Sequence, residues 1–247
     1  MNKSQKFIII AIILIVSMGT LYTLLWNEVE VYVNPEKEIS ETLDGERKQY
    51  YSDGRLRTIV NYDQGIKHGL STLFHQDGKT VMLTIPYEQG KRQGTSKKYF
   101  ETGKIYAETN YVDDKLHGQR KVYYRSGKVK SIVNYHKGFP GVGTVEYTTS
   151  GKKKPSIEIS QEVVGSTIQF STSSWCDNAR FFIGSLIDGA FFNAMDEKTL
   201  ELPKDASGLH FLDLNSISRD ELVNSDIVCS CLTSQNNPLI IKSSIAY

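Results

Sequence analysis

Residues 99–118, YFETGKIYAETNYVDDKLHG, contain the unit on which the architecture of this chain is built. An aromatic residue stands four positions before a glycine, and an alternating stretch that ends in tyrosine follows. The aromatic-to-glycine turn occurs five times, and its glycines are spaced by 24, 25, 24 and 24 residues. A fixed period of this size is typical of a stacked array of short units. The five turns are Tyr50 to Gly54, Phe74 to Gly78, Tyr99 to Gly103, Tyr123 to Gly127 and Tyr147 to Gly151.

The stretch after each turn glycine predicts a β-strand. In the third unit Ile105, Ala107, Thr109 and Tyr111 fall on one side, while the other side is polar. This period of two is typical of a strand with one buried face, and the opposite face of the units is mostly basic. A second turn follows, with two glycines four apart or with Asp114 in place of the first. Because these residues accept a left-handed backbone, we expect each unit to be a β-hairpin and the hairpins to pair into one elongated sheet.

The recurring Tyr-X-X-Gly-X-X-X-Gly pattern, with Lys-His-Gly at 67–69 and Leu-His-Gly at 116–118, resembles the membrane occupation and recognition nexus (MORN) repeat in its bacterial variant. The resemblance covers roughly residues 48–154. It implies membrane association, protein scaffolding or an antitoxin role, and little about activity. The fourth unit departs from the pattern because its second glycine is displaced, which predicts the end of the array. The second unit contains Pro86 and one extra residue, which predict a bulge there.

The N-terminal part carries a targeting signal. Residues 7–26 contain no charged side chain, and 20 helical residues span the roughly 30 Å of a bilayer core. Lysines precede this run and glutamates follow it, so residues 1–6 are expected in the cytoplasm and the rest outside it. Two interpretations stay open. The longer apolar run favours a single-pass transmembrane anchor (a signal-anchor), whereas Ser17 and Gly19 would suit a cleavable signal peptide. Both predict a protein at the cell membrane whose bulk is extracytoplasmic, in the periplasm or on the cell surface.

The charge distribution divides the rest of the chain. Residues 27–44 form an acidic linker. Residues 45–154, the predicted repeats, contain 21 basic and 10 acidic residues, a net charge of +11. Residues 155–247, a predicted C-terminal β domain, contain 5 basic and 12 acidic residues, a net charge of −7. The repeats and the tail are therefore expected to present different electrostatic surfaces, which either contact each other or address different partners.

A cation follows every turn glycine of the repeats. With two strands per unit, stacking would space these cations about 10 Å apart, close to the Debye length of about 8 Å. One hypothesis is that this row binds an anionic surface: lipid headgroups, an anionic wall polymer, or the acidic tail of the same chain. The alternative is that the cations only keep an exposed sheet soluble. The five residues are Arg55, Lys79, Lys104, Lys128 and Lys152.

All three cysteines lie in the tail, at Cys176, Cys229 and Cys231. In an oxidising compartment one disulfide is expected, between Cys176 and one of the other two, which leaves a spare thiol. Alternatively, all three are small buried hydrophobic residues. A metal site is not expected, because a Cys-X-Cys pair with one distant cysteine and no nearby histidine lacks the usual zinc ligand pairing.

The tail reads as short strands that suggest a small β-sandwich, so the predicted fold class is mostly β. Asp188-Gly189 is a hairpin signal, and Ser218 to Glu221 has capping-box spacing for one short helix. Four phenylalanines are expected to be core residues rather than a ligand cage: Phe181, Phe182, Phe191 and Phe192. The predicted strands cover 157–163, 167–172, 179–187, 190–194, 199–202, 209–214, 227–233 and 239–245.

No residue pattern indicates catalysis. His68 and His117 recur at one repeat position, as turn residues do, and no serine or cysteine has a nucleophile setting. We expect no catalytic residue, no cofactor and no nucleic-acid partner, and interpret the chain as a binding or scaffold protein with a protein or anionic partner. Two rival interpretations remain: an antitoxin or immunity-like factor, and an enzyme with its active site in the tail, where Asp177 and Asp188 are the acids to examine.

Overall fold

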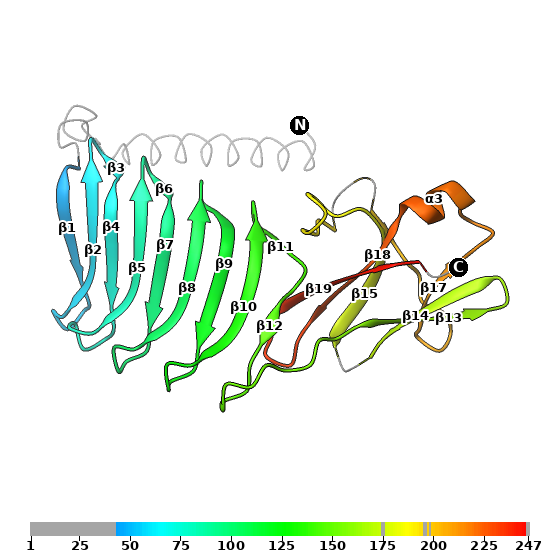
Figure 1. Ribbon diagram of the computed structural model, residues 1–247. Coiled ribbons are helices and arrows are strands. Elements are labelled where there is room, and N and C mark those ends of the chain that lie inside the picture. Colours follow the sequence, from blue (N-terminus) through cyan, green and yellow to red (C-terminus); the bar gives the residue numbers. More distant parts are fainter. Residues whose placement is uncertain (1–42, 174–175, 195–196, 198, 246–247) are drawn as a thin grey trace, which may run out of the picture. The chain divides into compact units, whose positions relative to one another are not determined.

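The computed structural model describes residues 43–247 except 174–175, 195–196, 198 and 246–247. Residues 44–247 form one unit that contains three antiparallel sheets (Figure 1). The apolar run at 7–26 lies outside the described residues. Within the described residues, no helix has the length and apolarity needed to cross a membrane.

The repeats form a single sheet of twelve strands, as the hairpin pattern predicts. Hairpins follow one another along it in chain order, β1-β2-β4-β5-β7-β8-β9-β10-β11, while the short strands β3, β6 and β12 pair with β2, β5 and β10. Each long strand pairs with the strand before and after it in sequence, so every contact in the array is local. The strands are β1 (Gly45–Tyr50), β2 (Leu56–Asp63), β3 (Ile66–Lys67), β4 (Gly69–Phe74), β5 (Val81–Glu88), β6 (Lys91–Arg92), β7 (Gly94–Tyr99), β8 (Ile105–Val112), β9 (Lys115–Tyr123), β10 (Val129–His136), β11 (Phe139–Pro140) and β12 (Val145–Glu146).

The aromatic-to-glycine turns share one hydrogen-bond pattern. In the first turn Tyr51 N donates to Arg55 O at 2.8 Å, and Gly54 N donates to Tyr51 O at 3.0 Å. The same pair of bonds recurs in turns 100–104, 124–128 and 148–152. Because the same backbone bonds close these four turns, the cation after each glycine occupies an equivalent place at one edge of the sheet. We call this edge the first-turn edge.

The extra residue of the second unit lies in its turn, so the predicted bulge at Pro86 is wrong. His75 N donates to Thr80 O, one residue later than in the other turns. Pro86 pairs with Leu70 in regular register. Pro86 also stands where Asn61 stands in the first unit, since Gln93 N donates to Pro86 O just as His68 N donates to Asn61 O. A proline at this position therefore leaves the repeat geometry unchanged.

The second turns stack on one another at the opposite edge, which we call the second-turn edge. Each has two consecutive residues with positive φ, the type I′ geometry that matches the twist of a hairpin. Asp114 (φ 66°) adopts it in the third unit in place of glycine. From the second unit on, the amide of the second positive-φ residue of each turn donates a hydrogen bond to the preceding unit, for example Gly138 N to Leu116 O at 2.8 Å. The pairs are Gln64-Gly65, Gln89-Gly90, Asp113-Asp114 and Lys137-Gly138.

Burial within the repeat sheet increases toward its C-terminal end. All six residues of β1 are exposed, whereas Ser131, Val133 and Tyr135 alternate as buried residues along β10. Neither of the two hydrophobic core clusters contains a residue of strands β1 to β10. Much of the apolar side is thus only half-buried in a single layer, and full burial begins where the C-terminal part meets the array.

The C-terminal part contains two sheets around a shared core, in line with the predicted mostly β fold. One sheet has the order β13-β14-β17 and the other β16-β15-β18-β19. Ile168 and Phe170 of the first sheet cluster with Phe181, Ile227 and Cys229 of the second, all at most 2% exposed. The strands are β13 (Ile159–Val164), β14 (Thr167–Thr172), β15 (Asp177–Gly184), β16 (Leu200–Glu201), β17 (His210–Asp213), β18 (Asp226–Leu232) and β19 (Pro238–Ser244).

Two local predictions in this part have different outcomes. Helix α3 (Arg219–Asn224) begins at the Ser218 capping box, which confirms that prediction. Residues 190–194 do not form the predicted strand. After the turn at Asp188 (φ 50°), Phe191 makes only isolated bridges, to Ile187 and to Gly141 of the repeat sheet.

Candidate functional site

All five turn cations of the first-turn edge are exposed, but they are not equivalent. Arg55 pairs with Asp53 at 2.5 Å, and this hydrogen bond lowers the pKa of Asp53 to about 2. Lys128 Nζ donates to the Ser150 carbonyl at 2.8 Å. Between described residues, no ion pair joins a carboxylate to the remaining members of the row. Lys79, Lys104, Lys128 and Lys152 therefore lack an ion-pair partner among the described residues.

The second-turn edge is partly neutralised by its own acids. Lys91 Nζ lies 3.0 Å from Asp113, and Arg92 Nε lies 2.9 Å from Asp114. Hydrogen bonds from the Arg92 backbone and side chain lower the pKa of Asp114. The guanidinium of Arg92 also lies 4.4 Å from the ring centroid of Tyr111. Two cations of the second-turn edge are therefore held in ion pairs between described residues, whereas on the first-turn edge only Arg55 among the five turn cations is.

Between described residues, no ion pair joins the acidic tail to the first-turn edge. The contact between described residues that brings an acid of the tail close to a basic residue of the repeats is His136 Nε2 to Asp188, at 3.6 Å. This contact lies beside the second turn of the fourth unit, Lys137-Gly138, at the second-turn edge of the sheet.

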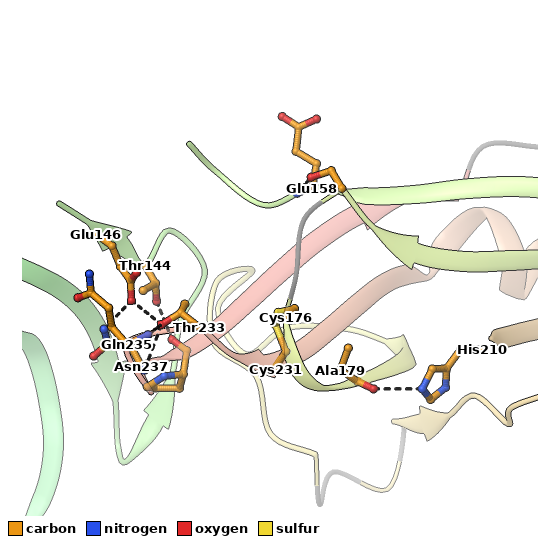
Figure 2. Close-up of a disulfide and its surroundings, with 12 residues drawn as sticks. Thr144, Glu146, Glu158, Cys176, Ala179, His210, Cys231, Thr233, Gln235 and Asn237 are labelled. Atoms are coloured by element: carbon orange, nitrogen blue, oxygen red, sulfur yellow. Dashed lines mark hydrogen bonds between the residues drawn. A yellow bond between two sulfur atoms is a disulfide. The ribbon is translucent and has the colours of Figure 1, made fainter. Parts of the chain in front are cut away.

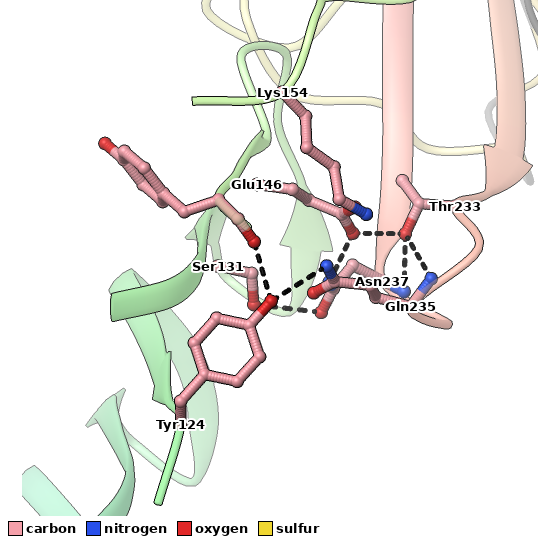
Figure 3. A network of polar contacts seen from close by, with 8 residues as sticks. Tyr124, Ser131, Glu146, Lys154, Thr233, Gln235 and Asn237 are labelled. Atoms are coloured by element: carbon pink, nitrogen blue, oxygen red, sulfur yellow. Dashed lines mark hydrogen bonds and ion pairs between the residues drawn. The ribbon is translucent and has the colours of Figure 1, made fainter. Parts of the chain in front are cut away.

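A buried polar network joins the repeats to the tail (Figure 3). Glu146 of β12 is 9% exposed; its Oε1 accepts hydrogen bonds from Thr233 and from Asn237 Nδ2, the latter at 2.7 Å. Its Oε2 lies 3.1 Å from Lys154 Nζ. Asn237 also lies 3.3 Å from Ser131 Oγ of β10. No sequence pattern marked these residues, because the partners lie 87 to 106 positions apart.

Gly141 explains the displaced glycine of the fourth unit. Its amide donates to Asn134 O at 2.8 Å, so it takes the position that His68 holds in the first unit. A Cβ atom on Gly141 would lie 2.8 Å from the ring of Phe191. The tail therefore docks on the array at Gly141, where the fourth unit departs from the repeat pattern. This position agrees with the predicted end of the array.

A groove of about 750 Å³ lies next to this network, between residues 142–157 and the edge strand β19. Its lining includes Glu146, Lys154, Asp226 and Lys242. Lys242 Nζ lies 2.9 Å from Asp226, so both acids of the groove are paired. Sequence reasoning missed this groove, because its walls come from segments about 90 residues apart.

Cys176 and Cys231 form a disulfide with a Cα–Cα distance of 5.9 Å (Figure 2). Cys229 is free and fully buried, and burial raises the pKa of its thiol to about 12. The structure thus selects one of the two pairings left open by the sequence, with Cys229 as the spare thiol. In the described residues no group of three or more histidine, cysteine or acidic side chains could hold a metal ion.

The other residues singled out in the sequence do not form a cluster. His117 lies in β9 with its ring 5.0 Å from that of His136, and His68 lies in the equivalent turn of the first unit. Asp188 is 69% exposed at a turn. Residue 177 begins β15, and its side chain lies outside the described part. Phe181, Phe182 and Phe192 are buried core residues, whereas Phe191 is half-buried against Gly141.

The middle of the chain is thus a single-sheet β-hairpin repeat array. Three of its segments, 43–64, 92–113 and 116–137, match the MORN repeat variant, so the repeat segment is a MORN-type array. The intervening residues 65–91 include the unit with the longer turn. Among curated proteins, no relative matches the chain.

Proposed function

We propose that this protein is a membrane-anchored, extracytoplasmic binding or scaffold protein, and that the first-turn edge of its MORN-type array contacts an anionic surface. The observation that carries this proposal is the row of Lys79, Lys104, Lys128 and Lys152, exposed and without carboxylate partners among the described residues. A regular row of lysines lets a polyanion or an anionic headgroup layer meet several charges at once.

Location rests on the sequence. The uncharged run at 7–26 suits a bilayer span, and the disulfide between Cys176 and Cys231 suits an oxidising compartment. Protease added to intact spheroplasts should degrade the repeats and tail. If both survive until the cells are lysed, the extracytoplasmic location is wrong.

The binding surface is tested with charge reversals on the two edges. We expect the full-length chain to bind vesicles of anionic phospholipid at low salt and to lose affinity as salt rises. At about 1 kcal/mol per lysine near an anionic surface, the loss of two lysines alone weakens binding about 30-fold, and Lys104→Glu with Lys128→Glu should exceed this because each glutamate adds a repulsion. The matched control is Lys115→Glu with Lys137→Glu. It changes net charge equally but lies on the second-turn edge, where both lysines are exposed.

Each result of this comparison is informative. A large loss confined to the first-turn pair supports the proposal. Equal losses in both pairs would mean that only net charge matters. Unchanged binding in the first-turn pair would eliminate that edge as the contact surface.

A further inference from the structure

We propose that the groove beside β19 binds an extended peptide of a partner protein by strand addition, and that the peptide alternates apolar and acidic residues. This site is distinct from the first-turn edge. The proposal begins from the position of β19 at the free side of its sheet, in the order β16-β15-β18-β19. A strand at a sheet edge presents unpaired main-chain groups that an extended peptide can use.

The direction of the backbone groups of β19 follows from its side-chain contacts. Pro238 O accepts from Thr144 Oγ1 at 2.8 Å, and Ser244 O accepts from Gln161 Nε2 at 2.8 Å. Both donors lie outside the β18–β19 ladder, so these carbonyls face away from β18. Alternate residues of an antiparallel strand face the same way. The amide and carbonyl of Lys242 therefore also point outward, into the groove that Lys242 lines.

The neighbouring outward residue is already partly engaged. Ile240 makes a parallel bridge with Val142, at the end of the groove nearest the repeats. Thr144 and Gln161 already donate hydrogen bonds to the carbonyl oxygens of Pro238 and Ser244. The open position of the edge is therefore centred on Lys242. A peptide that pairs there would continue the sheet between these two ends.

The facing wall of the groove also has main-chain groups that make no backbone hydrogen bond to another described residue. Pro155, Ser156 and Ile157 belong to no strand, and no backbone hydrogen bond joins them to another described residue. The preceding Lys154 N donates to Glu146 O, and Glu158 N donates to Ser173 Oγ, which fixes both ends of this wall. A volume of about 750 Å³ lies in the ~300–1,000 Å³ range of ligand sites.

The side chains of the groove define the peptide. Ile241 of β19 and Ile157 of the other wall, both partly buried against the core cluster that contains Leu239, supply the apolar surface of the groove. Two lysines of the groove are paired with Glu146 and Asp226, while Lys153 is exposed and has no carboxylate partner among the described residues. The groove therefore carries surplus positive charge beside an apolar strip. In a peptide that alternates valine-like and glutamate-like residues, the apolar side chains would contact the apolar strip and the acidic side chains would contact the positive charge.

The test uses the full-length chain in mild detergent and a fluorescent hexapeptide of alternating valine and glutamate. We expect saturable binding by fluorescence anisotropy, with at least tenfold weaker binding of the same peptide N-methylated at every residue and of a valine–lysine peptide. Lys242→Pro removes the outward amide, whereas Lys242→Ala removes the same side chain and keeps that amide. Proline is tolerated at edge positions whose amide faces away from the sheet. Lys242→Pro should therefore bind at least tenfold more weakly than Lys242→Ala.

A second variant does not depend on the strand. Lys153→Glu lies on the exposed wall and should weaken the valine–glutamate peptide at least fivefold. Lys104→Glu with Lys128→Glu should leave peptide binding unchanged, which separates this site from the first-turn edge. The proposal fails if the valine–glutamate peptide does not bind at millimolar concentration, or if the N-methylated peptide binds equally well. It also fails if the affinities of Lys242→Pro and Lys242→Ala for the peptide are equal and Lys153→Glu does not weaken binding.

Discussion

Asn237 Nδ2 donates a 2.7 Å hydrogen bond to Oε1 of Glu146, and this contact joins the turn before the last strand of the chain to the last strand of the repeat sheet. Both residues are buried, at 5% and 9% exposure. Thr233 donates to the same oxygen, and Lys154 pairs with the other. A buried carboxylate with this set of partners is stable only while the tail stays docked on the array. The contact therefore couples folding of the two parts.

We expect Asn237→Ala to lower the free energy of unfolding by about 2–3 kcal/mol, because it removes a hydrogen bond to a charged group and leaves part of Glu146 unsatisfied. Urea unfolding followed by tyrosine fluorescence measures this loss. Ser234→Ala, at an exposed position of the same turn, is the control and should change stability by less than about 0.5 kcal/mol. Equal effects of the two substitutions would show that the network contributes little.

Gly141→Ala tests the docking of Phe191 on the array. The new Cβ would lie 2.8 Å from the Phe191 ring and 3.2 Å from Ala190 O. Overpacking of this kind typically costs about 1–3 kcal/mol. In a double-mutant cycle with Phe191→Ala, the cost of Gly141→Ala should fall by at least half, because the ring it meets is gone. Fully additive effects would mean that the clash is relieved elsewhere.

The repeat array was predictable from sequence because its signals are local. Each hairpin is specified by residues within about 25 positions, and the glycines and Asp114 stand where the turns need positive φ. The longer turn of the second unit was misplaced for a physical reason. Proline is an obvious irregularity in a strand, but Pro86 occupies a repeat position where the backbone carbonyl, and not the amide, makes the recurring bond.

The junction with the tail could not be predicted in the same way. Glu146, Thr233 and Asn237 form a network only after two distant segments meet, and none has a local pattern that differs from an ordinary surface residue. Similarly, Gly141 looked like a displaced turn glycine. Its actual role is to leave room for Phe191, 50 residues later in the chain.

The free thiol should identify the disulfide pairing. With a pKa of about 12 and no solvent exposure, Cys229 should not react with iodoacetamide at pH 8 in the native protein. In urea without reductant, one cysteine should become alkylated, and peptide mapping should place the label on Cys229. A label on Cys231 would instead show that Cys176 pairs with Cys229, and labels on all three would show that no disulfide forms.

Asp77 should give the long turn of the second unit a defined dependence on pH. Its carboxylate accepts hydrogen bonds from the Thr80 hydroxyl and from the amides of Thr80 and Lys79, and these bonds, the Thr80 hydroxyl first, lower its pKa from 3.8 to about 2. Because the folded-state pKa is the lower one, this carboxylate stabilises the fold above about pH 3.8. The stabilisation is lost as pH falls toward about 2.

Asp77→Ala should therefore lower the thermal midpoint at pH 7, and the difference from the unmodified chain should shrink between pH 4 and pH 2. Circular dichroism melts across this range measure it. Glu101→Ala, at an exposed position in the turn of the next unit, is the control. A difference for Asp77→Ala that stays constant from pH 7 to pH 2 would show that the alanine acts through the backbone of the turn and not through the loss of a charge.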